Sequence, residues 1–172
     1  PPPMATLLSM LEQRVGDHLE KINEQSDVAS KEMSLAKALD KMLAVSKPMD
    51  FDCMEYRDSG THILRGLDEI QSLFDDHIVK TQAMRGSPFV KPFEQRCRDW
   101  EAKLISMQEI IDEWLKCQAV WLYLEPIFSS EDIMRQMPTE AKRFTQVDRM
   151  WRKTMEATSK APNVLQATSP DG

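Results

Sequence analysis

The feature that most constrains the fold is an apolar stripe whose members are separated by alternating steps of four and three residues. The stripe consists of Phe93, Cys97, Trp100, Leu104, Met107, Ile111, Trp114, Gln118 and Trp121. Such steps keep side chains on one face of an α-helix. A helix over about 92–124 would be roughly 50 Å long at about 1.5 Å per residue, close to the diameter of a small domain. The sequence therefore predicts a long, stiff rod with one buried face.

Prolines divide the region after this rod into shorter helices. We expect Pro126 to end the rod, a short helix to follow as far as Met137, and Pro138 to begin another helix that ends before Pro162. The last helix should bury one face, formed by Phe144, Val147, Trp151 and Thr154.

The N-terminal region carries apolar residues at seven-residue steps, which predicts helix over 4–47. The series is Leu8, Val15, Ile22, Ala29, Ala36 and Leu43. The polar residues 25–27 leave two alternatives open, one long helix or two helices with a short break. Two alanines among the six positions weigh against a self-associating coiled coil.

Between these regions, residues 51–64 favour a β-hairpin, because aromatic and β-branched residues flank the turn-forming triplet 58–60. An isolated hairpin is marginal in water, so it must lie against the helices or pair with strands supplied elsewhere. Helical spacing then resumes at Ile63, Leu67, Ile70, Phe74 and Ile78, and that helix should fray around 84–86. The predicted fold class is mainly α, an elongated multi-helix arm with long helices and a short β-hairpin.

Composition excludes several classes of partner. The 22 Lys and Arg against 28 Asp and Glu give a net charge of −6, so nothing general attracts nucleic acid or an anionic membrane. No run of about 18 apolar residues could cross a bilayer. Cys53, Cys97 and Cys117 are far apart, which suits inert or buried thiols in a reducing compartment.

Motifs for chemistry are missing as well. The sequence contains neither GxxxxGK(S/T) nor GxGxxG, so we expect no ATP hydrolysis by this chain alone. Only His77 directly follows two carboxylates, Asp75 and Asp76, and consecutive helical residues point to different sides. His77 with Cys97 lacks an oxyanion-forming element. We therefore predict no catalytic, cofactor-binding or metal-binding residues.

Two groups of residues are candidates for contact with a partner protein. The first is basic: five basic residues against two acidic ones lie between 140 and 153, namely Lys142, Arg143, Arg149, Arg152 and Lys153. The second is the aromatic pair around Pro126, Tyr123 and Phe128, which could instead pack the corner between two helices. An ordinary solvated helix face remains the stronger alternative for the basic group. The tryptophans are expected to form a structural aromatic core: Trp100, Trp114, Trp121 and Trp151.

Four blocks of sequence carry a resemblance to a known family. They are SPFVKPFEQRCRDWEAKL, DEWLKCQAVWLYLEPIFSSEDI, MPTEAKRFTQVDRMWRKTM and PNVLQAT. They resemble consecutive parts of the linker of dynein heavy chains. The likeness is strongest over 86–168 and extends back to about 51, whereas 1–47 offers only a compatible helical pattern. The form YLEPIFSSEDI is more similar to axonemal than to cytoplasmic heavy chains.

The resemblance implies a mechanical role. The dynein linker is an elongated helical arm that lies across a ring of AAA+ modules and bends and straightens with the nucleotide state of the ring, which moves the motor along microtubules. Residues 4–168 would be the N-terminal part of that arm, with 4–47 helical, 51–64 the hairpin and 65–168 helical. We interpret 1–3 as added or inter-domain residues and 169–172 as a flexible tail of an excised region.

By the same resemblance, the partner is the AAA+ ring of the same heavy chain, and microtubules are reached only through the rest of the motor. ATP and Mg would bind in later parts of the heavy chain, so no cofactor, nucleic acid or membrane is expected here, and this region is not itself an enzyme. The implied location is the cytoplasm, the cytoskeleton and the axoneme of a cilium or flagellum. A static helical interaction scaffold of the spectrin-repeat kind is the alternative, although the hairpin and uneven helix lengths fit it poorly.

Overall fold

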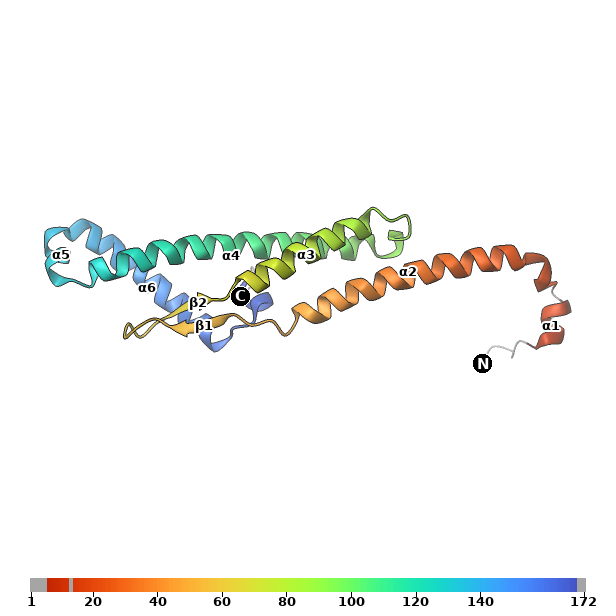
Figure 1. Cartoon of the computed structure of the whole chain (residues 1–172), viewed down its shortest axis with the longest axis horizontal. Helices are drawn as coiled ribbons and strands as arrows, with labels where there is room; N and C mark the ends of the chain where they lie inside the picture. Colours follow the sequence, from red (N-terminus) through yellow and green to blue (C-terminus); the bar gives the residue numbers. More distant parts are fainter. Residues whose placement is uncertain (1–5, 13, 170–172) are drawn as a thin grey trace.

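The computed structural model describes residues 6–12 and 14–169 and shows an elongated arrangement of helices with one small hairpin (Figure 1). The elements are α1 Leu7–Glu12, η1 Val15–His18, α2 Leu19–Ser46, β1 Asp52–Glu55, β2 His62–Arg65, α3 Asp68–Arg85, η2 Lys91–Phe93, α4 Glu94–Phe128, α5 Glu131–Gln136, α6 Pro138–Lys160 and α7 Val164–Ala167. The predicted fold class is confirmed. The interpretations made for residues 1–3 and 170–172 lie outside the described part of the chain.

The long helix α4 is the centre of the core. Every member of the predicted stripe is buried except Trp114, which is half-buried. Helix α3 packs along the first half of α4 through Ile70 and Phe74. An ion pair between Arg85 of α3 and the buried Glu101 of α4 joins the two helices beside this apolar contact.

The prediction that Pro126 ends the long helix is wrong by about one turn, since α4 continues to Phe128. A proline inside a helix removes the bond from its own nitrogen to the carbonyl four residues earlier. Here the lost bond is the one to the carbonyl of Leu122, close to the helix end, so the rest of the helix is unaffected. The backbone N–H of Ser129 closes the turn on the carbonyl of Glu125 at 3.0 Å.

The hairpin of β1 and β2 is antiparallel, as predicted, and it rests on helices. Its register pairs Cys53 with Leu64, and its turn contains Gly60 with φ of 69°, a conformation that favours glycine. Gln118 of α4 holds the second strand: the N–H of Leu64 donates to Oε1 at 2.8 Å, and Nε2 donates to the Leu64 carbonyl at 2.9 Å. Ile63, which lies within the predicted hairpin 51–64 and also starts the helical spacing, belongs to β2, where it pairs with Met54.

Helix α6 turns back along α4 after the short α5 (Figure 1). Its buried face differs from the predicted one, because Val147 and Thr154 are exposed while Met155 and Thr158 are buried with Trp151. The polar Thr158 tolerates burial because its hydroxyl donates to a backbone carbonyl of its own helix. The apolar spacing in the sequence instead predicted the neighbouring face of α6, which carries Phe144 and Val147.

The segment after α6 is hydrogen-bonded to the loop between α2 and β1. Asn163 donates from Nδ2 to the carbonyl of Lys47 at 2.9 Å, and the N–H of Val164 donates to the carbonyl of Met49 at 2.8 Å. The N–H of Phe51 donates to the carbonyl of Pro162 at 2.7 Å. The residues that lead into β1 are therefore hydrogen-bonded to the residues that lead into α7.

Helix α2 extends away from this block (Figure 1). The chain breaks before α2, where Arg14 has a left-handed φ of 52°, and not at 25–27, which lie on the exposed surface of a continuous helix. Only three residues of α2 are buried, Leu39, Met42 and Ser46. The seven-residue series is helical but spans three elements: Leu8 lies in α1, Val15 in η1 and the other four members in α2. Of these four, Ala36 and Leu43 pack against the core, and Ile22 and Ala29 are exposed.

Candidate docking surfaces

The tryptophans expected in a structural core lie at the joints between elements. Trp121 stacks on Trp151 of α6 at 5.3 Å between ring centroids, and its edge meets Tyr56 of the hairpin turn at 5.4 Å. Its indole Nε1 donates to Asp148 at 3.0 Å. We call Trp121, Trp151 and Tyr56 the aromatic joint, because these three rings bring α4, α6 and the hairpin together.

The other two tryptophans support the same rod at different points. Trp100 is buried beside His77 of α3, with 6.4 Å between the ring centroids. Trp114 is half-buried and meets Phe51 edge to face at 5.5 Å. Aromatic contacts of this geometry add roughly 0.5–1.5 kcal/mol each beyond burial, so they brace α4 along much of its length.

Of the two aromatic residues around Pro126, the structure buries one and exposes the other. Phe128 is buried and stacks on Phe144 of α6 at 5.1 Å, so it packs the corner between the two helices. Tyr123 is 72% exposed. Of the two residues, only Tyr123 therefore has a surface that a partner protein could contact.

The basic residues of α6 also differ in whether they are exposed or take part in internal contacts. Lys142, Arg149 and Lys153 lie seven and four positions apart, share one exposed face of the helix, and have no ion-pair partner among the described residues. Arg152 is half-buried: its Nε donates to Asp148 at 2.8 Å and its guanidinium also bonds the carbonyl of Ser59. We name the three exposed residues the basic stripe, and Arg152 is part of the contact with the hairpin.

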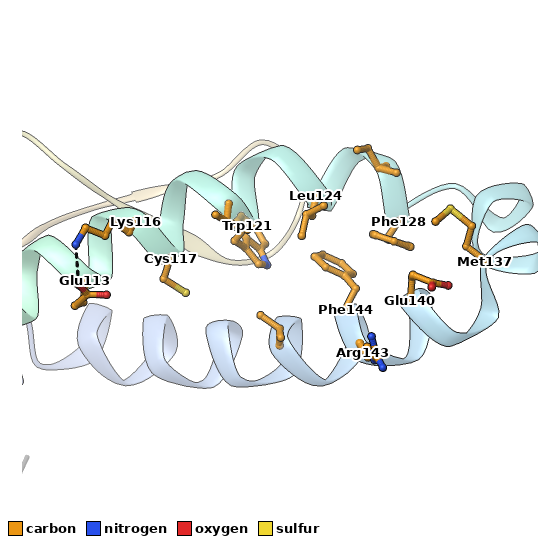
Figure 2. A pocket seen from close by; sticks show the side chains of 13 residues that line it. Glu113, Lys116, Cys117, Trp121, Leu124, Phe128, Met137, Glu140, Arg143 and Phe144 are labelled. Carbon is orange, nitrogen blue, oxygen red and sulfur yellow. Dashed lines mark hydrogen bonds and ion pairs between the residues drawn. The ribbon is translucent and has the colours of Figure 1, made fainter.

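The fifth basic residue, Arg143, lies at the edge of a groove that was not predicted (Figure 2). The α4–α6 groove has a volume of about 840 Å³ and runs between the C-terminal half of α4 and the first turns of α6. Its apolar walls include Cys117, Val120, Leu124, Ile127, Phe144 and Val147. The signal was present in the sequence as a second apolar series on α4, at steps of three and four, beside the main stripe.

The structure also places the histidine, cysteine and acidic residues singled out in the sequence. Within 6–12 and 14–169, no three His, Cys, Asp or Glu residues gather as metal ligands would. His77 is buried while Asp75 and Asp76 are exposed, so these neighbours point apart. Burial raises the pKa of the Cys97 thiol, which keeps it protonated and unreactive. None of the described helices is both long and apolar enough to span a membrane.

Comparison with known proteins places the chain in a family. The family described as "Dynein heavy chain, N-terminal region 2" matches residues 1–172. Dynein axonemal heavy chain 12 of Homo sapiens is 53% identical over 167 residues, which is 97% of this chain and 5% of that protein. Dynein axonemal heavy chain 3 of Homo sapiens is 51% identical over 161 residues, 94% of this chain and 4% of that protein.

A third relative, dynein axonemal heavy chain 1 of Mus musculus, is 47% identical over 164 residues, 95% of this chain and 4% of that protein. The chain thus spans 4–5% of the length of these relatives. They support the resemblance seen in the sequence and offer no support for a spectrin-type repeat. The chain belongs to the dynein heavy chain family, among the axonemal members, and corresponds to N-terminal region 2 of those proteins.

Proposed function

We propose that this region is a non-catalytic lever, the N-terminal part of a linker that moves against the AAA+ ring of the same heavy chain during the ATP cycle and drives ciliary or flagellar motility. The observation that carries the proposal is the braced rod. Helix α4 has 35 residues, about 52 Å at 1.5 Å per residue. It is supported by α3, the hairpin and α6 along its length, and such a braced helix transmits displacement without bending.

A lever also needs a face whose contacts change. A conformational equilibrium shifts only when the two positions differ in contact free energy. The basic stripe of Lys142, Arg149 and Lys153 offers three exposed positive charges on a chain whose net charge is −6. We infer that it contacts an acidic surface of the ring in one nucleotide state, with exposed Tyr123 as a second contact. ATP, Mg and microtubules would be bound by other parts of the motor, in the axoneme.

The test is a titration of this chain against the separately produced AAA+ ring of the same heavy chain, without nucleotide, with ADP and with an ATP analogue. We expect affinity to depend on the nucleotide. Changing both Arg149→Gln and Lys153→Gln should weaken the tighter complex about tenfold, as two exposed charge pairs of about 0.7 kcal/mol each predict. It should also reduce the dependence of affinity on salt.

A matched control removes two exposed lysines elsewhere, Lys37→Gln with Lys103→Gln, and should leave the tighter complex unchanged apart from a small general charge effect. Equal affinity in all three states would contradict a moving lever and favour a static scaffold. A folded chain that binds no state of the ring would place the ring contacts outside residues 1–172.

A further inference from the structure

We propose that the α4–α6 groove is the seat of an amphipathic helix supplied by a part of the same heavy chain outside residues 1–172. The inference goes beyond the lever, because it concerns a permanent packing contact and not the moving contact with the ring. It begins from a feature of the surface: an apolar groove of about 840 Å³ lies open between α4 and α6, beside the stacked pairs Trp121–Trp151 and Phe128–Phe144 that join these helices.

The shape of the groove fits a helix. On α4, the wall residues Cys117, Val120, Leu124 and Ile127 follow one another at steps of three, four and three. Helix α6 runs back beside α4 and contributes Phe144 to the facing wall (Figure 2). Two neighbouring helices with apolar residues at this spacing form the groove that a third helix fills in a bundle.

The length of the groove sets the length of its occupant. Its lining on α4 runs from Glu113 to Phe128. Fifteen residue steps of about 1.5 Å make roughly 22 Å, which corresponds to about four turns of a docked helix. An occupant with apolar residues at i, i+3 or i+4, and i+7 would therefore reach the whole floor.

The chemistry of the groove excludes most other ligands. Val120 is 59% exposed and Val147 is 47% exposed, so apolar surface lies in contact with water. At the rim, Glu113 and Lys116 are bonded to each other at 2.7 Å, and the two remaining charged residues, Glu140 and Arg143, have opposite signs, so the rim has no net charge to attract an ion or a nucleic acid. A small-molecule site would also need polar groups that converge on the ligand, whereas these walls are nearly all hydrocarbon.

The length of the relatives indicates that the occupant helix comes from the same polypeptide. The relatives are so long that this chain covers only 4–5% of them. A helix elsewhere in the same polypeptide is tethered to the groove, and tethering gives effective concentrations in roughly the millimolar range. A second copy or a separate protein must instead offset the loss of translational and rotational freedom on association. We therefore infer an occupant from the same chain.

The experiment uses the intact heavy chain with a photo-reactive amino acid in place of Val120. On irradiation we expect one intramolecular cross-link, to a peptide outside residues 1–172 that has apolar residues at helical spacing. The same cross-link should form without nucleotide, with ADP and with an ATP analogue. The matched control places the photo-reactive residue at Ile105, an exposed aliphatic position on α4 outside the groove, and should lose that product.

A second readout uses the thiol of Cys117, which lines the groove and is exposed in this structure. In the intact heavy chain a seated helix shields this thiol, so its alkylation, followed by mass spectrometry, should be slow. Val120→Asp places a charge in the groove and should speed the alkylation of Cys117. Ala119→Asp makes the same change at an exposed position outside the groove and should leave the rate unaltered.

Several results would overturn the proposal. A cross-link from position 120 to a second copy or to another polypeptide would assign the groove to that partner instead. No product from position 120, together with fast alkylation of Cys117 in the unaltered protein, would show an empty groove. A cross-link to the AAA+ ring in only one nucleotide state would assign the groove to the moving contact.

Discussion

The core around α4 and the N-terminal half of α2 have the same kind of helical apolar periodicity, and yet only the first is buried. In α4, Leu104 and Ile111 have no exposed surface. In the N-terminal half of α2, Leu19 is 57% exposed and Ile22 is 44% exposed. The two helices have different neighbours. Helix α4 is covered by α3, the hairpin and α6, whereas the buried residues of α2, Leu39, Met42 and Ser46, all lie toward its C-terminal end.

This comparison separates two properties that periodicity alone does not distinguish. An apolar stripe shows which face of a helix would be buried if a partner were present. Whether a partner is present depends on distant segments, such as the turn of the hairpin that carries Tyr56 to Trp121. The buried region should therefore be sensitive to truncation of its side chains, and the exposed half of α2 should tolerate the same change.

The largest effect is expected at the centre of the buried region. Trp121→Ala should lower the free energy of unfolding by about 3 to 5 kcal/mol, because it leaves a cavity where Trp151 and Tyr56 now pack. It also removes the indole bond to Asp148. Chemical denaturation followed by circular dichroism measures the change.

The matched control lies two residues further along α4. Tyr123→Ala removes an aromatic ring that is 72% exposed, and the free energy of unfolding should change by no more than about 0.5 kcal/mol. A similar loss in both variants would contradict the distinction between the two faces of α4 at this point.

A second prediction compares two positions within α2 itself. Leu39 has no exposed surface, so Leu39→Ala should cost about 2 to 4 kcal/mol. Ile22 is 44% exposed, and Ile22→Ala should change stability by about 0.5 kcal/mol or less, since alanine also favours the helix slightly. Equilibrium unfolding at two protein concentrations measures both. A large cost for Ile22→Ala, or stability that rises with concentration, would show that this half of α2 is covered in solution.

Much of the fold followed from local sequence signals. The stripe on α4 predicted a long buried helix, and the hairpin followed from a turn triplet between β-forming residues. The predictions that were wrong concern residues whose burial depends on contacts with segments distant in the sequence. Val147 looked like a core residue of α6, but contact with α4 and the hairpin turned Met155 inward instead. The break near Arg14 does have a glycine close by, Gly16 in η1, but the apolar pattern pointed to 25–27 as the only place for a break.

The candidate surfaces were less predictable than the fold. Charge density selected five basic residues, but it could not show that Arg152 is bonded to Asp148 and Ser59. The role of Gln118 was hidden too, because its partner is the backbone of Leu64, 54 positions away. The groove required knowledge that α6 returns along α4. Local patterns identify faces of helices, whereas a surface for docking depends on which faces the fold leaves open.

The smallest predicted effect concerns the place where α2 joins the core. Burial lowers the pKa of His77 below its usual value near 6.5, although the charge of Asp76 opposes this shift and that of Lys80 adds to it. The ring of His77 lies 3.4 Å from the hydroxyl of Ser46, through Nδ1 and Oγ, in the last turn of α2.

A pKa that is lower in the folded than in the unfolded state stabilises the fold above the unfolded pKa, and this stabilisation is lost as the pH falls through the folded value. Acidification from pH 7.5 to 5.5 should therefore destabilise the protein. The free energy of unfolding, measured at both pH values, should fall less in His77→Gln, which cannot take up the proton. An equal fall in both proteins would place the pH dependence elsewhere. A smaller fall in the variant would show that charging one side chain weakens the junction through which the exposed half of α2 is attached to the core.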